Sequence, residues 1–261
     1  VLVVGLADAG LLPLHAAIAV IMGANVGTTV TGQLLSFNLA DYALLPAALG
    51  LLLLACGTEK LRVAGRALCG LAVLLAGMKL LGTAVIPLRE TAWFATVLAL
   101  AAHRRLLGVA VGAVAAAIVQ SSSAVAGITL SLTRAGVLNL PAGVAIMMGA
   151  DIGTCADTLL AGFFSGKTAR QAALAHLLFN VCSVILLLPV FPLFIRVAAV
   201  SAQTLPRQLA NAHTLYNLCG AILLLLFLKP FQALVENLVR TERHVKKRIL
   251  PPFSEMIRKW F

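Results

Sequence analysis

Long apolar runs separated by short polar segments make up most of this 261-residue chain. A membrane-spanning helix needs about 20 predominantly apolar residues, and several of the runs supply most or all of that length. Two other segments, Trp93–Ala102 and Phe191–Val200, are only about 10 residues long, which suits half-helices or interfacial pieces. The pattern predicts an all-α transmembrane fold with about seven to nine membrane segments. The long runs are Leu44–Cys56, Ala67–Val85, Leu107–Val119, Ala172–Val190 and Leu209–Leu228.

The composition also indicates a membrane protein, because 61% of the residues are hydrophobic and only 11% are charged. Soluble domains carry about 25% charged residues, so this chain has too few charges to cover a water-facing surface. Membrane lipid is therefore expected to surround most of it. The five cysteines are scattered and form no Cys-x-x-Cys pair, which indicates free thiols rather than a disulfide framework or a zinc site.

The net charge of +11 would suggest a nucleic-acid partner in a soluble protein. Here the positions of the charges argue against that partner. Twelve of the 20 Lys and Arg residues precede Lys229, mostly between apolar runs, and the other eight lie in the last 33 residues. Basic residues are enriched in the cytoplasmic segments of membrane proteins. We therefore expect a transmembrane domain over residues 1–228, a basic cytoplasmic tail over residues 229–261, and no nucleic-acid binding.

An internal repeat is visible at an offset of 126 residues. Ala9–Thr28 aligns without gaps to Ala135–Thr154, with eleven of twenty positions identical. Secondary transporters are commonly built from duplicated halves, with the substrate site at helices interrupted by Gly or Pro. We assign repeat one, incomplete, to residues 1–90 and repeat two to residues 104–228. We expect a helix interruption at Gly23–Gly27 and another at Gly149–Gly153.

A second repeat has an offset of 37 residues and relates Arg170–Leu188 to Arg207–Leu225. Each copy contains a His and an Asn four residues apart, which places the two side chains on one face of a helix. These pairs are His176 with Asn180 and His213 with Asn217. The favoured interpretation is a packing motif in which they hydrogen-bond a neighbouring helix. A direct role in a transport site is the alternative.

Four consecutive polar residues, Gln120, Ser121, Ser122 and Ser123, interrupt an apolar region. Such groups are costly in hydrocarbon unless their hydrogen bonds are satisfied. Their oxygens suit a hard cation such as sodium, and a broken helix end at this point would offer N–H donors to an oxyanion. Hydrogen bonding between transmembrane helices is the alternative explanation.

Acidic and hydroxyl side chains lie close to the main repeat. Asp151 and Asp157 are the only acids between Glu90 and Glu236, and both lie in an apolar segment. An ionisable residue inside the membrane is a functional candidate. Thr28, Thr29 and Thr154 are candidate ligands for a cation or a substrate.

The segments Gln120–Ser123, Gly149–Thr154 and Gly23–Thr29, with the two Ala-His-x-x-Phe/Tyr-Asn segments, resemble the type II sodium/phosphate cotransporter family. The resemblance covers roughly Val1 to Leu228. It implies two inverted repeats with re-entrant hairpins and broken helices, in a multi-pass protein of the plasma (inner) membrane. It also implies inorganic phosphate and sodium as partners, with sodium as the coupling ion, no other cofactor and no enzymatic activity.

The resemblance assigns roles to individual residues. Phosphate is expected at Gln120, Ser121, Ser122, Ser123, Asn25 and Thr28. Sodium is expected at Gln120, Ser121, Ser123, Thr29, Asp151 and Thr154. The family also has a Gln-Ser-Ser-Ser element in its first repeat, and the offset of 126 would place its Gln seven residues before Val1. We therefore expect this element ahead of Val1. A soluble regulatory domain beyond the C-terminus is a further expectation.

The function expected on this basis is sodium-coupled symport of inorganic phosphate by alternating access. Phosphate export, phosphate sensing and transport of another small oxyanion remain alternatives, since the same site serves each of them. A third class of function is a membrane enzyme with a serine nucleophile among Ser121–Ser123 and with His176 or His213 as the base. The Gly-x-Ser-x-Gly elbow of many serine hydrolases is absent from the sequence.

Overall fold

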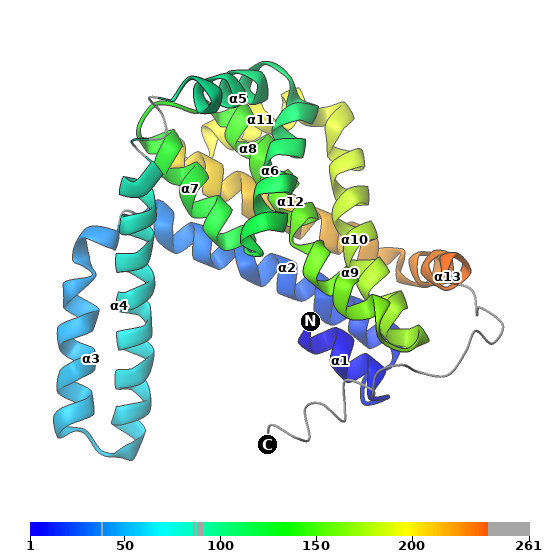
Figure 1. The fold of residues 1–261 in the computed structure, drawn as a ribbon, viewed down its shortest axis with the longest axis horizontal. Helices are drawn as coiled ribbons and strands as arrows, with labels where there is room; N and C mark the ends of the chain where they lie inside the picture. The colour runs from blue at the N-terminus through cyan, green and yellow to red at the C-terminus, as the bar shows by residue number, and fades with distance from the viewer. Residues whose placement is uncertain (38, 86, 88–90, 240–261) are drawn as a thin grey trace.

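The computed structural model describes residues 1–37, 39–85, 87 and 91–239 and is a bundle of α-helices (Figure 1). The part of the chain that it describes contains no β-strand. The first seven helices are α1 (Leu2–Asp8), α2 (Leu14–Ser36), α3 (Leu44–Cys56), α4 (Glu59–Val85), α5 (Ala92–His103), α6 (Arg105–Val119) and α7 (Ser122–Arg134). The next six are α8 (Leu140–Gly153), α9 (Cys155–Phe163), α10 (Lys167–Leu187), α11 (Phe191–Val200), α12 (Leu205–Leu226) and α13 (Leu228–Leu238). Short 3₁₀ turns precede α3 and α11.

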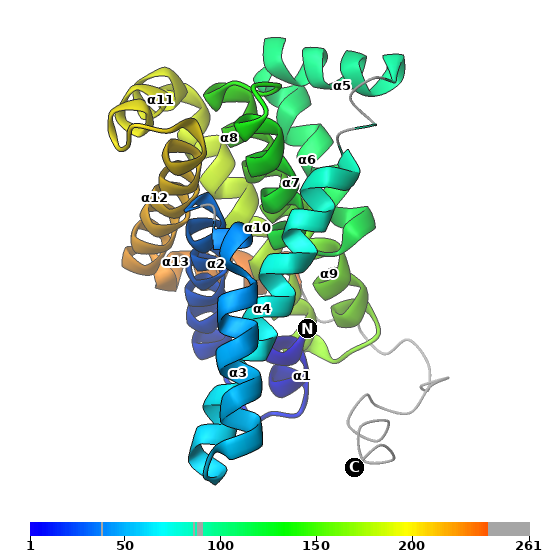
Figure 2. The same cartoon turned by 90° about the vertical axis from the view of Figure 1, so that its left-hand side faces the viewer.

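Four helical stretches in the described residues are long and apolar enough to cross a membrane: Leu14–Ser36, Leu140–Phe163, Lys167–Val200 and Leu205–Leu226. The predicted all-α membrane fold is therefore confirmed. The number of membrane segments stays a prediction, because Leu44–Cys56 and Arg105–Val119 are apolar but shorter. The two segments of about 10 residues fold as the short helices α5 and α11, which lie at the same end of the molecule (Figure 2), and their role as half-helices or interfacial pieces stays a prediction.

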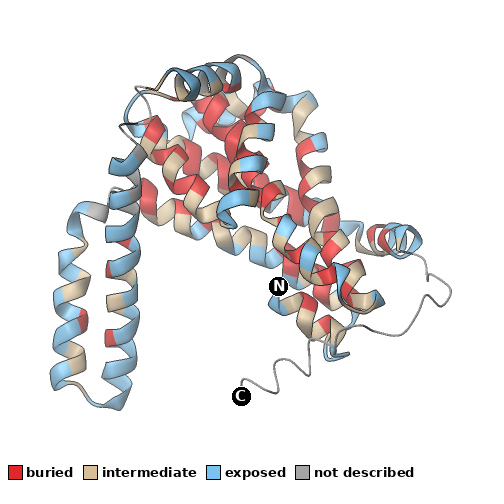
Figure 3. Cartoon of the chain, viewed as in Figure 1, coloured by how far each residue is buried: buried red, intermediate tan, exposed pale blue. Residues whose placement is uncertain are grey.

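The core lies where α2, α6, α7, α8, α10 and α12 meet, whereas α3 and α4 form an arm that extends away from it (Figure 3). Large apolar side chains remain exposed on many helices, including Ile118, Val200 and Leu226. Such surfaces are suited to lipid rather than to water. The predicted basic tail begins in α13, and its residues 240–261 lie outside the described residues.

The repeat at an offset of 126 residues is confirmed as a repeat of local structure. Helices α1 and α7 both end in a turn with a left-handed glycine, Gly10 and Gly136, each with φ of +71°. A left-handed residue just past a helix end is a common helix stop, and glycine adopts it without a side-chain clash. The backbone hydrogen bonds also correspond, with Leu11 N to Leu6 O at 3.0 Å and Val137 N to Leu132 O at 2.9 Å. Helices α2 and α8 then begin at equivalent residues.

The predicted interruption at Gly23–Gly27 is wrong, because α2 continues unbroken from Leu14 to Ser36. In the second copy α8 also runs through Gly149, and the break comes only at Thr154. The glycines of this copy serve packing instead. A Cβ at Gly149 or Gly153 would overlap the α6 backbone at Val109 or Ala113. Small residues that let two backbones approach are typical of helix contacts in membranes.

Candidate functional site

The chain breaks between α6 and α7 at the four polar residues. Helix α6 ends at Val119, and Gln120 takes the left-handed conformation with φ 56° and ψ 30°. This conformation costs a non-glycine residue about 1–2 kcal/mol. Ser121 then caps α7, because its hydroxyl oxygen accepts a hydrogen bond from Ala124 N at 3.2 Å. Serine is a preferred residue at this position, so the local sequence explains the restart of the helix.

The tip of this helix pair faces a cavity of about 290 Å³. Four other elements line the same cavity: α1, α2, the α8–α9 junction with the start of α9, and α10. The structure therefore brings together residues that are more than 150 positions apart in the sequence. The polar lining residues are Asn25, Thr28, Gln120, Ser121, Ser122, Ser123, Thr154, Asp157, Thr158 and His176.

The repeat contributes equivalent residues to the cavity from both copies. Thr28 and Thr154 occupy equivalent positions, and both line it. Their hydroxyls donate to backbone carbonyls one turn earlier, Thr28 to Ala24 O and Thr154 to Asp151 O, both at 3.0 Å. A hydroxyl that donates its proton in this way keeps its lone pairs for a cation or for an incoming donor.

Among the described residues that line this cavity, Asp157 is the only acidic side chain, and none is Lys or Arg. Its Oδ1 accepts a hydrogen bond from the backbone N of Thr158 at 2.6 Å. The Thr158 hydroxyl lies 3.1 Å from His176 Nδ1. The sequence indicated Asp157 as a candidate acid without a ligand role and His176 only as an alternative. Thr158 was missed, although its spacing of four residues from Thr154 places both hydroxyls on one helix face and could have revealed it.

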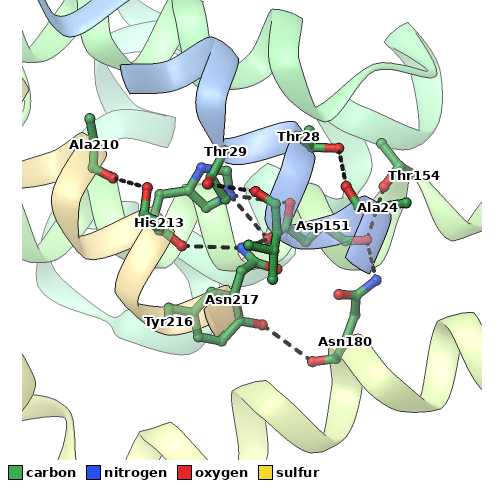
Figure 4. A network of polar contacts seen from close by, with 12 residues as sticks. Ala24, Thr28, Thr29, Asp151, Thr154, Asn180, Ala210, His213, Tyr216 and Asn217 are labelled. Carbon is green, nitrogen blue, oxygen red and sulfur yellow. Dashed lines mark hydrogen bonds and ion pairs between the residues drawn. The ribbon is translucent and has the colours of Figure 1, made fainter. Parts of the chain in front are cut away.

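Asp151 lies outside the cavity lining, in a buried polar network (Figure 4). His213 Nε2 donates to its carboxylate at 3.1 Å from Oδ2, and Asn217 Nδ2 donates to Oδ2 at 2.9 Å. Asn180 Nδ2 donates to the backbone carbonyl of Asp151 at 3.0 Å. Thr29 is also buried and donates to Val26 O at 2.7 Å. Sodium ligation by Asp151 and Thr29 stays a prediction, for which the cavity lining gives no support.

The same network confirms the favoured interpretation of the second repeat. The two Asn residues and His213 hydrogen-bond α8 at Asp151, and His176 hydrogen-bonds α9 at Thr158. Helices α10 and α12 are thereby tied to the α8–α9 segment by equivalent residues. Buried carboxylates are stable only when paired and hydrogen-bonded, which accounts for an acid at a fully enclosed position.

The cavity can serve ions of both signs. Hydroxyl, amide and carboxylate oxygens are ligands for a hard cation such as sodium, and the start of the 13-residue helix α7 offers N–H groups to an anion. The described residues contain no group of three His, Cys, Asp or Glu side chains placed to hold a metal ion.

Comparisons with known proteins identify a family. The sequence model of the family described as Na+/Pi-cotransporter matches residues 1–83 and 89–228. An uncharacterized protein of Bacillus subtilis, YqeW, is 31% identical over 72% of this chain and 62% of its own length. The putative inorganic phosphate export protein YjbB of Escherichia coli is 26% identical over 92% of this chain and 45% of its own length.

A shorter match reaches a human protein. Sodium-dependent phosphate transport protein 2B is 37% identical over 91 residues, which are 33% of this chain and 13% of that protein. No solved structure matches this chain. The chain therefore spans about half to two thirds of the two bacterial relatives named above and a small part of the human one.

Proposed function

The chain belongs to the Na+/Pi-cotransporter family, and we propose that it moves inorganic phosphate across the plasma membrane together with sodium, by alternating access. The observation that carries this proposal is the cavity in which Gln120–Ser123 face Thr28 and Thr154 from the two repeat copies. Transport sites at the interface of repeats, built from broken helices, are common among secondary transporters.

The two ions would occupy different parts of this cavity. We assign phosphate to the start of α7, where Ser122 and Ser123 present hydroxyls and helix N–H groups beside the amide of Gln120. We assign sodium to the oxygens of Thr154 and Asp157, with Asn25 and Thr28 facing them from α2. Asp157 would thus take the acidic role that the family resemblance implies for Asp151.

This distribution of charge supplies a reason for coupling. A phosphate dianion would meet a carboxylate and no Lys or Arg among the described lining residues. Unlike charges within a few ångströms attract strongly in a low-dielectric site, whereas like charges repel. A sodium ion beside Asp157 would remove that repulsion and raise the affinity for phosphate. By linkage, phosphate would raise the affinity for sodium by the same factor.

Flux of labelled phosphate in proteoliposomes tests the proposal. A sodium gradient should drive phosphate movement, and replacement of sodium by choline should reduce the flux at least tenfold. Equal flux in the two media would contradict sodium coupling. Competition by sulfate and arsenate in the same assay determines how strictly the site selects phosphate.

Export is the second candidate, because the relatives named YjbB are described as putative inorganic phosphate export proteins. The same cavity can serve either direction, since the direction of net flux follows the ion gradients. Vesicles loaded with phosphate and placed in sodium-free or sodium-containing medium separate the two. Efflux that persists without sodium on either side would favour export and contradict symport.

A further inference from the structure

A second polar cavity, of about 630 Å³, lies at the C-terminal ends of α2 and α7 and the N-terminal end of α12. It is separate from the site described above, because the two cavities share none of their described lining residues. Its charged lining consists of two arginines, Arg134 and Arg207, and its hydroxyls come from Ser36, Thr133 and Thr204. No acidic side chain lines it in the described part of the chain.

Arg207 is fixed in place by several contacts. One terminal nitrogen donates to Gln33 Oε1 and to Ser36 Oγ, both at 2.9 Å. The guanidinium also stacks on Phe37, with Cζ 3.7 Å from the ring centroid. Arginine presents five N–H donors in a rigid plane, so these contacts orient the group and leave other donors available.

Arg134 faces the same cavity from the end of α7. One of its terminal nitrogens donates a hydrogen bond to Leu35 O at 3.1 Å. The described residues show neither arginine in an ion pair with a carboxylate. Two guanidinium groups with spare donors in one cavity, and no carboxylate between them, suit an oxyanion, which arginine binds with paired hydrogen bonds.

A ladder of polar residues connects this cavity to the first one. On α2, Asn25, Thr29, Gln33 and Ser36 follow at helical spacing, and on α12 so do Arg207, Asn211, Thr214 and Asn217. Gln33 Nε2 lies 2.8 Å from Thr214 Oγ1 and 3.2 Å from Asn211 Oδ1. The contact between α2 and α12 is therefore polar around Gln33, between the two cavities.

We propose that Arg134 and Arg207 form a second site for a phosphate group, either free inorganic phosphate or the headgroup of a phospholipid. Binding at this site needs no sodium, because the side chains supply the positive charge. If this site holds free phosphate, it is a second binding site on the transport path, at the opposite end of the polar ladder from Gln120–Ser123. That transport role rests on the proposed function, whereas binding itself does not.

Equilibrium binding of labelled inorganic phosphate to delipidated protein in choline medium tests the site. We expect saturable binding that weakens as ionic strength rises, since exposed charges are screened. The variant Arg134→Gln and the double variant Arg134→Gln/Arg207→Gln should each lose at least tenfold in affinity. Arg196→Gln, on the exposed face of α11, is the matched control and should bind like the unaltered protein.

A second experiment distinguishes free inorganic phosphate from a phospholipid headgroup as the source of the bound phosphate group. Native mass spectrometry of protein in nanodiscs of phosphatidylglycerol or phosphatidylcholine reports retained lipid. Retention of phosphatidylglycerol that both arginine variants abolish identifies a headgroup, and sodium-free phosphate binding that they abolish identifies free phosphate. Absence of both, or indifference of both to Arg134→Gln while the variant stays folded, overturns the site. Sodium-dependent flux through the first cavity is unaffected by that result, so the two proposals fail separately.

Discussion

His213 Nε2 lies 3.1 Å from Asp151 Oδ2, and both side chains are buried, with 3% and 4% of their surface exposed. Asp151 belongs to α8 and His213 to α12, so this contact joins, through a polar bond, two of the stretches that are long and apolar enough to cross a membrane. Asn217 on the same face of α12 adds a second bond to the carboxylate. The pair fixes the register of α12 against α8, and α12 in turn packs along α2, which lines the cavity.

Replacement of Asp151 by alanine is expected to destabilise the protein. The change leaves His213 Nε2 and Asn217 Nδ2 buried without this acceptor, and each buried donor left unsatisfied costs about 1–3 kcal/mol. Thermal unfolding in detergent should show a clearly lower midpoint. Asp157→Ala is the control, because it loses one backbone hydrogen bond in a cavity wall and should cost about 1 kcal/mol or less. Equal midpoints for the two variants would contradict this role of Asp151.

Glycines in close helix contacts should respond to alanine differently from glycines on open helix faces. At Gly149 a Cβ would meet the backbone of Val109, so Gly149→Ala should cost about 1–3 kcal/mol by overpacking. At Gly70 in α4 nothing lies within 4 Å, and Gly70→Ala should be neutral or stabilise the helix by about 0.5–1 kcal/mol. Unfolding midpoints of the two variants give the comparison. A loss of stability in Gly70→Ala as large as in Gly149→Ala would refute the packing explanation.

Substitutions at Gln120 distinguish an effect on protein stability from an effect on phosphate transport. Glycine relieves the left-handed strain at this position, so Gln120→Gly should leave stability unchanged or raise it by about 1 kcal/mol. Loss of the amide should still reduce phosphate flux at least tenfold. Gln120→Ala is the matched variant, which keeps the strain and loses the amide. If Gln120→Gly transports phosphate normally, the amide has no part in binding.

The first turn of α10 is expected to depend on Asp8, a residue of α1. Its Oδ1 accepts a hydrogen bond from the backbone N of Gly166, the residue that precedes α10. Asp8→Ala removes this cap and should cost about 1 kcal/mol, whereas Asp8→Asn keeps an oxygen acceptor and should cost less. Hydrogen exchange at the first turn of α10 is the most local readout. Unchanged exchange in Asp8→Ala would show that the cap has no effect.

Much of the site follows from the sequence because it depends on local pattern. The break at Gln120–Ser123 follows from a polar quartet between apolar runs and from the capping preference of serine. The approach of Thr28 and Thr154 to one cavity agrees with the repeat, which predicted a shared site without distances. The inverted orientation of the repeats and the re-entrant form of the hairpins remain predictions.

Other features depend on which helix lies alongside and could not be read from one chain. Asp151 and Asp157 are six residues apart, so at 100° per residue they point in different directions, and only the packing decides which one meets the cavity. Glycine permits both a helix break and a close helix contact. Gly149 and Gly153 serve the contact because α6 lies against them, a relation that periodicity does not reveal.

The most direct test of the shared cavity is equilibrium binding of labelled phosphate to purified protein in sodium and in choline medium. The comparison uses the unaltered protein and the variant Thr28→Val/Thr154→Val, which removes one hydroxyl from each repeat copy and keeps the shape of both side chains. We predict a sodium-dependent site whose affinity falls at least tenfold in the variant. Sodium-dependent binding of equal affinity in both proteins would contradict the assignment of the ion site to this cavity.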